Sequence, residues 1–495
     1  MNAFYNSSKT DGIEFECLSD DWNREIYSVD ASNYVIKPSL IFHPQDDNEV
    51  LQIMMYAQKK GVSITCKGAG TGLVGQSLGS GIVIDFARKM NKILEITDDH
   101  VIVQPGVVKT VLDIELRKRG KFLPPDPSSS NYCTIGGMIA NNASGPHGLG
   151  YGSIIDYVDA VNIIYADGSN NTVQENQKHD PRILRALHLV SSYSGYIRNS
   201  YPDVSKNSCG YRLDSIIDQE GKVKPQRLFA ASEGTLGIVT SAKLRIVDLP
   251  PIKYFLILEF SSIQRAAKAV PRILRYSPVA LELLDPYIGI ESNTLQQQQP
   301  HSRRCTLYVE FDSVNEATLN EKVSIFESEF ASISKIVDGG EDESGMKKAS
   351  FERRNALNSI MKLAFGSRKP VGIIEDTVVP PALLHYYLEY LLGLYKKYNI
   401  KFVIYGHAGN GNLHTRPFID FESKRDMEIL EILTEEVFRF IVIHGGSISG
   451  EHGDGLARTK YIPIMYGYKL YSIFKEIKKI FDPSNLLNPN KKIIL

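Results

Sequence analysis

Two short segments in the second half of the chain combine histidine, glutamate and glycine in a way that suits metal chemistry. The first, GHAGNGNLH, follows an apolar run, so His407 would end a strand. Glycines then permit a reversal that would bring His414 back beside it on a second strand. The second, SGEHGDGLAR, places Glu451 next to His452 in a glycine-rich context. Two imidazoles and one carboxylate leave coordination positions open, which suits a catalytic metal site.

The ordinary alternative for a histidine at the end of a strand is a hydrogen-bonded core residue. That alternative holds for either segment alone, and we adopt it for His43, His147 and His444. Four such groups in glycine-rich loops favour the metal site instead. Asn412 lies between the two histidines of the first segment, where it could supply turn geometry or hydrogen-bond a substrate.

A cluster of glycines in the first half contains a G-x-G-x-x-G spacing at Gly70, Gly72 and Gly75. In a dinucleotide-binding Rossmann fold this motif opens a helix. Here the chain soon enters the apolar run IVIDF, which leaves no room for that helix. A glycine-rich loop between two strands instead predicts a nest of backbone N–H groups that can bind a diphosphate. A flexible surface loop is the alternative.

Two further segments of small residues favour the same interpretation. The prolines of PPDP fix an extended segment before TIGGMIANNASG at residues 134–145, where few side chains are larger than asparagine. Small residues would let a flat ring lie against the backbone. SEGTLGIVT at residues 232–240 places Glu233 and two glycines just before a strand. Each segment could also be an ordinary tight turn.

The composition excludes several classes of protein. The chain has 495 residues, 43% hydrophobic and 23% charged, so it can bury one large core or two ordinary ones. With 56 basic and 57 acidic residues it has no excess positive charge for binding nucleic acid. Its apolar runs are too short to span a bilayer and its first residues lack signal-peptide features, which predicts a cytoplasmic protein. Its five cysteines form no CxxC pair, so we expect buried thiols.

The order of apolar runs predicts an α+β protein in three parts. Residues 1–250 form the first part, with one clear helix at residues 46–61 and many short strands. Those strands are expected at residues 39–43, 63–67, 82–86, 100–104, 158–166 and 238–247.

The second part, residues 251–445, alternates strands and helices and predicts an α/β substrate domain. Strands are expected at residues 254–260, 306–311 and 401–407, helices at residues 263–276 and 382–398, and a further apolar run lies at residues 371–379. The third part, residues 446–495, begins with glycines and ends in a helix near residues 466–481. The apolar face of that helix would pack back on the first part.

Five motifs in this order resemble the FAD-binding domain of the vanillyl-alcohol oxidase superfamily, the p-cresol methylhydroxylase type. They are KGAGTGLVGQS, PPDPSS, TIGGMIANNASG, the Tyr151–Gly152 pair and EGTLGIVT. The resemblance covers roughly residues 35–250 and implies a two-part FAD-binding domain beside a ferredoxin-like substrate domain. Some members attach the flavin through a histidine in the glycine loop. Residues 68–81 contain none, so we expect non-covalent FAD.

The resemblance also implies how FAD is held. Residues 67–76 would wrap the diphosphate, and residues 134–144 would line the isoalloxazine and the ribityl chain. Pro125 and Asp126 would flank the flavin, and Glu233 would lie near the adenine or close the pocket. The expected FAD contacts are Lys67, Gly68, Ala69, Gly70, Thr71, Gly72, Leu73, Gly75, Gln76, Pro125, Asp126, Thr134, Gly136, Gly137, Asn141, Ser144, Gly152, Glu233, Gly237 and Ile238.

The histidine segments, together with ALELLD, IEDTVVP and FDPSNLLNPNK, resemble the D-lactate dehydrogenase and glycolate oxidase D-subunit branch of that superfamily. This resemblance implies flavin-dependent oxidation of a D-2-hydroxy acid of the D-lactate, glycolate or D-2-hydroxyglutarate type. His407, His414 and Glu451 would hold a divalent zinc, manganese or iron ion, and His452 would be the base. The family usually shows GHxGDGNxH, and Asn410 stands at the aspartate position here.

The substrate carboxylate also needs a cationic partner. In FERRN, Arg354 takes the place of the arginine in the family's W-x-x-R pattern, and Arg353 and Arg416 are rivals. Two alternative functions remain. The protein could be a non-redox flavin enzyme resembling alkylglycerone-phosphate synthase, or an inactive flavin-binding subunit of an electron-transfer complex.

The expected electron acceptor is a quinone, a cytochrome or an electron-transfer flavoprotein, and we expect a homodimer. If the acceptor is a quinone, lysines of the last helix could touch the inner membrane, although a solvated helix face is the commoner case. These lysines are Lys469, Lys475, Lys478 and Lys479.

Overall fold

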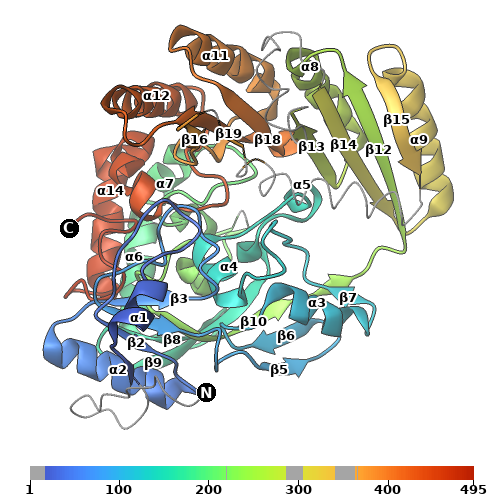
Figure 1. Ribbon diagram of the computed structural model, residues 1–495. Coiled ribbons are helices and arrows are strands. Elements are labelled where there is room, and N and C mark those ends of the chain that lie inside the picture. The colour runs from blue at the N-terminus through green and yellow to red at the C-terminus, as the bar shows by residue number, and fades with distance from the viewer. Residues whose placement is uncertain (1–16, 219, 286–304, 341–359, 361–362, 365) are drawn as a thin grey trace, which may run out of the picture.

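The computed structural model describes residues 17–495, apart from residues 219, 286–304, 341–359, 361–362 and 365. The first half of the chain forms the lower lobe in Figure 1, and the residues from β12 to α12 form most of the upper lobe. The last helix runs back down the side of the lower lobe. The fold mixes helices and sheets, which confirms the α+β prediction.

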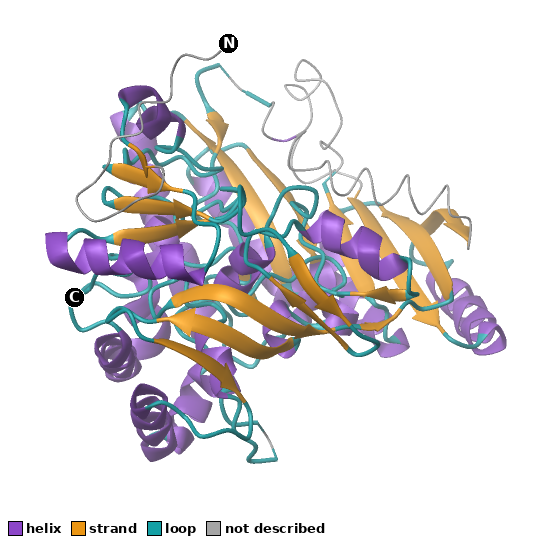
Figure 2. Ribbon diagram, turned by 90° about the horizontal axis from the view of Figure 1, so that it is seen from below, coloured by secondary structure: helices purple, strands orange, loops and turns teal. Residues whose placement is uncertain are grey.

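The lower lobe contains a small sheet of order β1-β2-β4-β3. Its strands are β1 (Cys17–Leu18), β2 (Leu40–Phe42), β3 (Ile64–Lys67) and β4 (Ile82–Asp85). Helix α2 (Asp47–Lys60) lies beside this sheet in Figure 2 and buries Val50, Ile53 and Met54. The helix begins where the Asp46 side chain accepts from the backbone N–H groups of residues 48 and 49, and it ends at the left-handed Gly61.

A second sheet of the lower lobe has five antiparallel strands in the order β5-β6-β10-β8-β9. They are β5 (Ile93–Ile96), β6 (His100–Val103), β8 (Val158–Ile164), β9 (Asn170–Gln174) and β10 (Ile238–Arg245). The intervening chain forms α3 (Lys109–Arg117), α4 (Ile135–Asn141), α5 (Gly148–Tyr151), α6 (Pro181–Ser192) and α7 (Ser194–Ser200). A separate two-stranded sheet joins β7 (Lys121–Phe122) to β11 (Val247–Asp248).

The upper lobe is built on an eight-stranded sheet of order β15-β12-β14-β13-β18-β19-β16, with β17 paired to β19. Its strands are β12 (Ile252–Phe260), β13 (Ala280–Leu284), β14 (Cys305–Ser313), β15 (Lys335–Gly340), β16 (Lys369–Pro370), β17 (Thr377–Val378), β18 (Phe402–His407) and β19 (Asn412–Ile419). The first four strands and helices α8 (Ile263–Ile273) and α9 (Glu316–Phe330) follow the β-α-β-β-α-β order of a ferredoxin-like unit.

Two further helices belong to the second half of this sheet, namely α11 (Leu384–Lys397) and α12 (Lys424–Ile443). The sequence patterns above predict α11 but not α12. Leu433, Val437 and Ile441 recur at four-residue spacing and are buried, so α12 presents an ordinary amphipathic stripe to the core.

The C-terminal part contains α13 (Gly455–Arg458) and α14 (Ile462–Phe481). Helix α14 buries Leu470, Ile473, Phe474 and Ile477, and it packs against α6. Beyond it, residues 486–488 run beside β3, because Ile64 N donates to Leu486 O at 2.7 Å and Asn488 N donates to Ile64 O at 2.7 Å. The end of the chain therefore lies against the strand that leads into the glycine loop.

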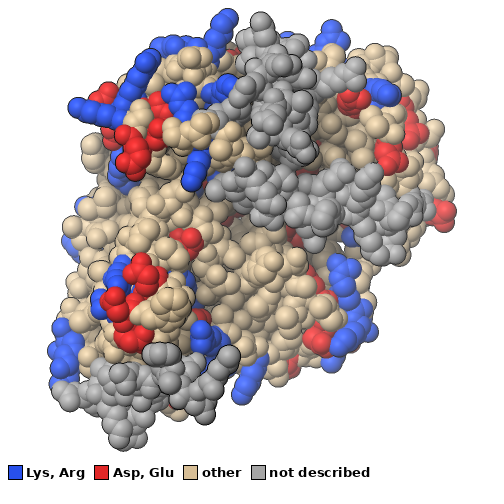
Figure 3. All heavy atoms as spheres, viewed as in Figure 1, with Lys and Arg blue, Asp and Glu red and all other residues tan. Residues whose placement is uncertain are grey.

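The lysines of α14 do not share one solvated face. Lys478 is buried and donates to Asp482 Oδ2 at 2.6 Å and to Thr235 O at 2.9 Å. The expectation of a basic helix face is therefore wrong at Lys478. No helix among the described residues combines the length and the apolar character needed to cross a bilayer. On the face in Figure 3, basic side chains are interspersed with acidic ones.

Candidate active site

A large cavity in the lower lobe reaches the region beneath the eight-stranded sheet. It contains about 1580 Å³ of space outside the protein atoms, part of it open to solvent. Its lining includes the glycine loop between β3 and β4 and the small residues of α4.

The glycine loop connects β3 to β4 without a helix, as the sequence predicts. Gly70 and Gly75 have φ values of +67° and +77°, a region that favours glycine. At the end of β3, Lys67 Nζ donates to Val29 O at 2.7 Å. Gln76 Nε2 donates to the backbone oxygen of His452 at 3.0 Å. The loop therefore contacts the histidine segment directly.

Thr134 begins α4 as its N-cap residue, and its hydroxyl accepts from Gly137 N at 3.4 Å. A Cβ atom at Gly136 would lie 2.6 Å from Pro105 Cβ, so this first turn of the helix packs closely on the neighbouring loop. Gly136 and Gly137 both line the cavity and bring no side chain to its wall, which fits a flat ring lying against backbone.

We expect Gly68→Ala to lower the affinity for FAD by about 10- to 100-fold. The new Cβ would lie 2.2 Å from Thr134 Oγ1 and 3.3 Å from Thr134 Cβ, so the N-cap residue of α4 must move. Overpacking of this kind costs about 1–3 kcal/mol. Titration of the flavin-free protein with FAD measures the effect. Gly393→Ala on α11 is the control, because no atom lies within 4 Å of its added Cβ. Unchanged FAD affinity in Gly68→Ala would contradict the expectation.

Most of the residues expected to bind FAD line this cavity. They are Lys67, Gly68, Ala69, Gly70, Thr71, Gly72, Leu73, Gln76, Thr134, Gly136, Gly137, Asn141, Ser144, Glu233 and Gly237. Five expected residues are not part of the lining, namely Gly75, Pro125, Asp126, Gly152 and Ile238. Lining residues that the sequence analysis does not name as FAD contacts include Phe86, Pro105, Phe229, Val239 and Tyr405.

The hairpin of β18 and β19 brings the first two metal-ligand candidates together. His407 ends β18 opposite Asn412, and Gly411 turns the chain with φ +66°. His407 Nε2 lies 2.8 Å from Glu451 Oε1, and His414 Nε2 lies 3.5 Å from the same oxygen. All three side chains are nine-tenths buried or more. The structure therefore gathers His407, His414 and Glu451 at one point.

Two charged residues contact His407 and Glu451 on the sides that face away from the shared point. Both carboxylate oxygens of Glu282, on β13, lie 2.9 Å from His407 Nδ1. Lys206 Nζ donates to Glu451 Oε2 at 2.9 Å, and Gly145 N donates to the same oxygen at 2.9 Å. The Oε1 atom of Glu451 is thus left facing the histidines. Glu282 lies in the ALELLD segment, but nothing in that segment assigns it to the site, and Lys206 lies in none of the motifs.

His452 approaches the cluster from the other side. Its ring stacks on the ring of His414, with centroids 4.9 Å apart and 17° between the planes. Its Nδ1 lies 3.1 Å from Glu375 Oε1, while Glu375 Oε2 lies 2.5 Å from Arg416 Nη2. Arg416 is therefore engaged with a carboxylate. Arg353 and Arg354 lie outside the described residues.

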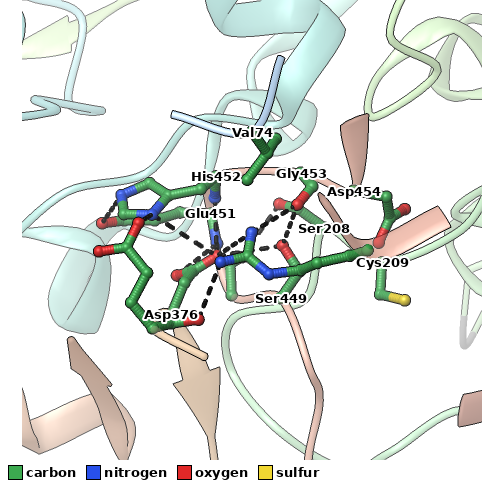
Figure 4. Close-up of polar contacts among 12 residues, drawn as sticks. Val74, Ser208, Cys209, Asp376, Ser449, Glu451, His452, Gly453 and Asp454 are labelled. Atoms are coloured by element: carbon green, nitrogen blue, oxygen red, sulfur yellow. Dashed lines mark hydrogen bonds and ion pairs between the residues drawn. The ribbon is translucent and has the colours of Figure 1, made fainter. Parts of the chain in front are cut away.

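Asp376 organises the segment that carries Glu451 and His452 (Figure 4). Its carboxylate accepts from Glu451 N at 3.1 Å and from His452 N at 2.9 Å. Asn412 Nδ2 donates to Asp376 Oδ1 and to Thr377 O, both at 3.2 Å. Asn410 is buried, and its amide donates to Ser205 Oγ at 2.8 Å.

The buried charges shift the pKa values of the three candidate ligands in different directions. Burial opposes protonation of His407, but the Glu282 and Glu451 carboxylates outweigh it and raise its pKa to about 9. Burial instead lowers the pKa of His414. The pKa of Glu451 is held well below its usual value, because Lys206 and His407 outweigh the effect of burial. Glu451 is therefore a carboxylate at neutral pH.

These side chains fit a divalent cation. The ligand atoms of His407, His414 and Glu451 all lie within 4.8 Å of one another. Two imidazole nitrogens and a carboxylate oxygen are a common catalytic zinc set, and a carboxylate behind a ligating histidine is its usual support. His414, Glu451 and His452 also line the same cavity as the glycine loop. Two of the three candidate ligands, His414 and Glu451, thus line the same cavity as the glycine loop.

Comparison with known proteins identifies the family of this chain. Residues 249–492 match the model of the C-terminal domain of FAD-linked oxidases, and residues 38–173 match an FAD-binding domain. The glycolate oxidase subunit GlcD of Bacillus subtilis is 31% identical over 95% of this chain and 93% of its own length. The chain belongs to this family of FAD-linked oxidases.

Other similar proteins are named as dehydrogenases of 2-hydroxy acids. A D-lactate dehydrogenase of Anaerostipes hadrus is 28% identical over 96% of this chain and 94% of its own. A D-2-hydroxyglutarate dehydrogenase of Pseudomonas putida is 28% identical over 99% of this chain but only 51% of its own, so this chain spans about half the length of that relative.

Two solved structures show that the fold extends beyond the close relatives. A 4-ethylphenol oxidase of Gulosibacter chungangensis superposes with a TM-score of 0.70 at 14% identity, over 96% of this chain and 94% of its own. An alkyldihydroxyacetonephosphate synthase superposes with a TM-score of 0.65 at 18% identity, over 96% of this chain and 82% of its own. The fold of the vanillyl-alcohol oxidase superfamily is therefore confirmed, as is membership of the FAD-linked oxidases.

Proposed function

We propose that the protein oxidises a D-2-hydroxy acid to the 2-oxo acid, with FAD as the hydride acceptor. One observation carries the proposal: His414, Glu451 and His452 line the same cavity as the glycine loop. The names of the relatives support this substrate class, since they include glycolate oxidase, D-lactate dehydrogenase and D-2-hydroxyglutarate dehydrogenase.

We assign FAD binding to the cavity-lining residues of the glycine loop, of α4 and of the segment at Glu233. FAD supplies the acceptor for the hydride that leaves C2 of the substrate. The backbone N–H groups of the glycine loop would hold the diphosphate. Buried side chains around α4 would exclude water from the flavin ring.

We assign a divalent cation to His407, His414 and Glu451. Such a cation lowers the pKa of a coordinated hydroxyl group and offsets the charge of a neighbouring carboxylate. Glu282 accepts from His407 Nδ1, which would leave Nε2 of this ring to hold the cation. Lys206 and Gly145 donate to Glu451 Oε2, which would leave Oε1 to hold the cation.

His452 is the proposed base for the substrate hydroxyl proton. Glu375 accepts from Nδ1 of this ring, which leaves Nε2, 3.9 Å from Glu451 Oε1, to take the proton. The Glu375 pKa is held well below its usual value, because Arg416 and His452 outweigh its burial. Glu375 therefore stays ionised and keeps the His452 ring in one orientation and tautomer.

The polar residues around this base have separate proposed roles. We retain Arg354 as the proposed partner of the substrate carboxylate. Arg416 already forms an ion pair with Glu375, so we do not assign it to the substrate carboxylate. Asn412 does not line the cavity, and its amide donates to Asp376. We therefore propose that Asn412 supports the segment that carries Glu451.

The remaining partners are also proposals. Electrons would leave the reduced flavin to a quinone, a cytochrome or an electron-transfer flavoprotein. We also propose that the protein is a homodimer in the cytoplasm. Contact with the inner membrane would have to involve surfaces other than a continuous lysine face of α14, since Lys478 is buried.

Anaerobic mixing of the FAD-loaded protein with a panel of 2-hydroxy acids tests the function. We expect D-lactate, glycolate or D-2-hydroxyglutarate to bleach the visible absorbance of the flavin, because hydride transfer reduces it. The L enantiomers of the chiral acids are the matched controls and should leave the absorbance unchanged. If no acid bleaches the flavin, the protein is a non-redox flavin enzyme or an inactive subunit, and the proposal fails.

A further inference from the structure

A second ionic cluster lies outside the cavity lining and joins the two lobes. His147 lies between two carboxylates, with Nδ1 2.8 Å from Asp126 Oδ2 and Nε2 2.8 Å from Glu310 Oε2. Asp126 belongs to the lower lobe, whereas Glu310 is on β14 of the upper lobe. Only 19% of the His147 side chain is exposed, so solvent screens these contacts weakly.

The geometry requires a charged imidazole. A neutral ring has one N–H group and could donate to only one of the two carboxylates. Burial opposes the charge, but Asp126 and Glu310 outweigh it and raise the His147 pKa to about 10. At neutral pH both ring nitrogens therefore donate, and the imidazolium links the lobes.

Contacts near His147 fasten the same loop to the upper sheet. The Tyr151 hydroxyl donates to Asp312 on β14. Gly150 N donates to Val279 O at 3.1 Å, immediately before β13. Strands β13 and β14 pair with each other, and β13 carries Glu282, which supports His407. The loop is thus attached to the part of the sheet that positions a metal ligand.

The beginning of this loop reaches Glu451. Gly145 N donates to Glu451 Oε2, and Gly145 O accepts from Lys206 Nζ at 2.8 Å. Asp126 restrains this region, because its carboxylate also accepts from His147 N at 3.3 Å. A Cβ at Gly145 would lie 2.5 Å from Asp126 O, so these two backbone segments are in close contact.

We propose that His147 is a positioning residue for the metal site. Its links to Asp126 and Glu310 fix the loop that presents Gly145, and through Gly145 and Lys206 they fix the orientation of Glu451. The inference rests on the proposed metal site. It implies that the site has full affinity only while the two lobes are held together by this bridge.

Zn²⁺ binding by the FAD-loaded full chain, stripped of metal and titrated against a chromophoric chelator, tests the proposal. We expect His147→Ala to raise the dissociation constant for Zn²⁺ by about 10- to 100-fold, the usual effect of losing an outer support of a metal ligand. The FAD content should stay at the wild-type level. His188→Ala, at an exposed position of α6, is the control and should bind Zn²⁺ like the wild type.

Two further variants separate positioning from folding. Glu310→Gln removes the carboxylate on the upper lobe while His147 keeps its contact with Asp126, and we expect the same loss of Zn²⁺ affinity. His147→Arg restores a cation between the carboxylates and should recover part of the affinity.

Wild-type Zn²⁺ affinity in His147→Ala or Glu310→Gln, at full FAD content, would overturn the proposal. So would loss of FAD from both variants, since the bridge would then serve the fold as a whole. If the wild type itself fails to bind Zn²⁺, the proposed metal site is wrong before the bridge is considered.

Discussion

Replacement of His414 by alanine is expected to remove the bound metal and to slow flavin reduction by a D-2-hydroxy acid about 10³-fold or more. A metal ion that stabilises a developing alkoxide contributes several kcal/mol, and about 4 kcal/mol corresponds to that factor. Among the described residues, none hydrogen-bonds His414 Nδ1, so the substitution breaks few contacts other than those at the metal site. Metal analysis and anaerobic stopped-flow absorbance measure the two effects.

The FAD content separates loss of the metal from loss of the fold. His414→Ala should retain FAD, because the glycine loop and α4 supply most of the cofactor lining. Wild-type protein treated with a chelator should match the variant, and added Zn²⁺ or Mn²⁺ should restore only the wild type. His188→Ala should behave as the untreated wild type. A variant that keeps both metal and rate would show that His414 is not a ligand.

The central part of this site could be predicted from the sequence because its geometry is local. His407 and His414 lie on the two arms of one hairpin, and Gly411 adopts the positive φ that the turn needs. Glu451 and His452 are adjacent and lie in a glycine-rich segment. The meeting of the two segments is not local, and the sequence supports it only through the chemistry of the residue types.

The supporting residues could not be predicted in the same way. Lys206 lies in no motif, and Glu375 lies in IEDTVVP, which gives it no role by itself. Each acquires its role only by packing against a distant segment. Glu282 did leave a signal, since it is a single glutamate inside the apolar strand ALELL. A glutamate is almost never fully buried unless it is paired, so this position implies a cationic or N–H partner in the core.

Two segments folded differently from their patterns for identifiable reasons. Residues 135–141 form α4, although two adjacent glycines lower their helix propensity, because Thr134 caps the first turn. The apolar run at residues 371–379 forms only the short strand β17. Its central Glu375 and Asp376 turn into the site, and Asp376 has φ +68°, which interrupts an extended strand.

Replacement of His452 by glutamine is expected to slow flavin reduction by about 10²- to 10⁴-fold, the usual contribution of a general base. The variant should keep its metal, because His407, His414 and Glu451 are the proposed ligands. It should also keep FAD, since the contact of this segment with the glycine loop is made by the backbone oxygen of His452. Single-turnover absorbance, metal analysis and the flavin content report these three properties.

This experiment also decides between two assignments of His452. Its ring nitrogen lies in a second possible ligand group with Glu375 and His414, so it could hold the metal rather than take the proton. Loss of metal from His452→Gln would favour that second group and would contradict its role as the base. Glu375→Gln provides the companion test, because it keeps a hydrogen-bond acceptor for Nδ1 but removes the charge that pairs with Arg416.

If His452 is the base, Glu375→Gln should slow flavin reduction less than His452→Gln does and should leave the metal in place. The reason is that the imidazole remains and only its orientation is less well fixed. If Glu375 is instead a ligand, the metal should be lost from this variant as well. Equal metal content in both variants, with a graded loss of rate, therefore requires His452 to act on the substrate and Glu375 to act through His452.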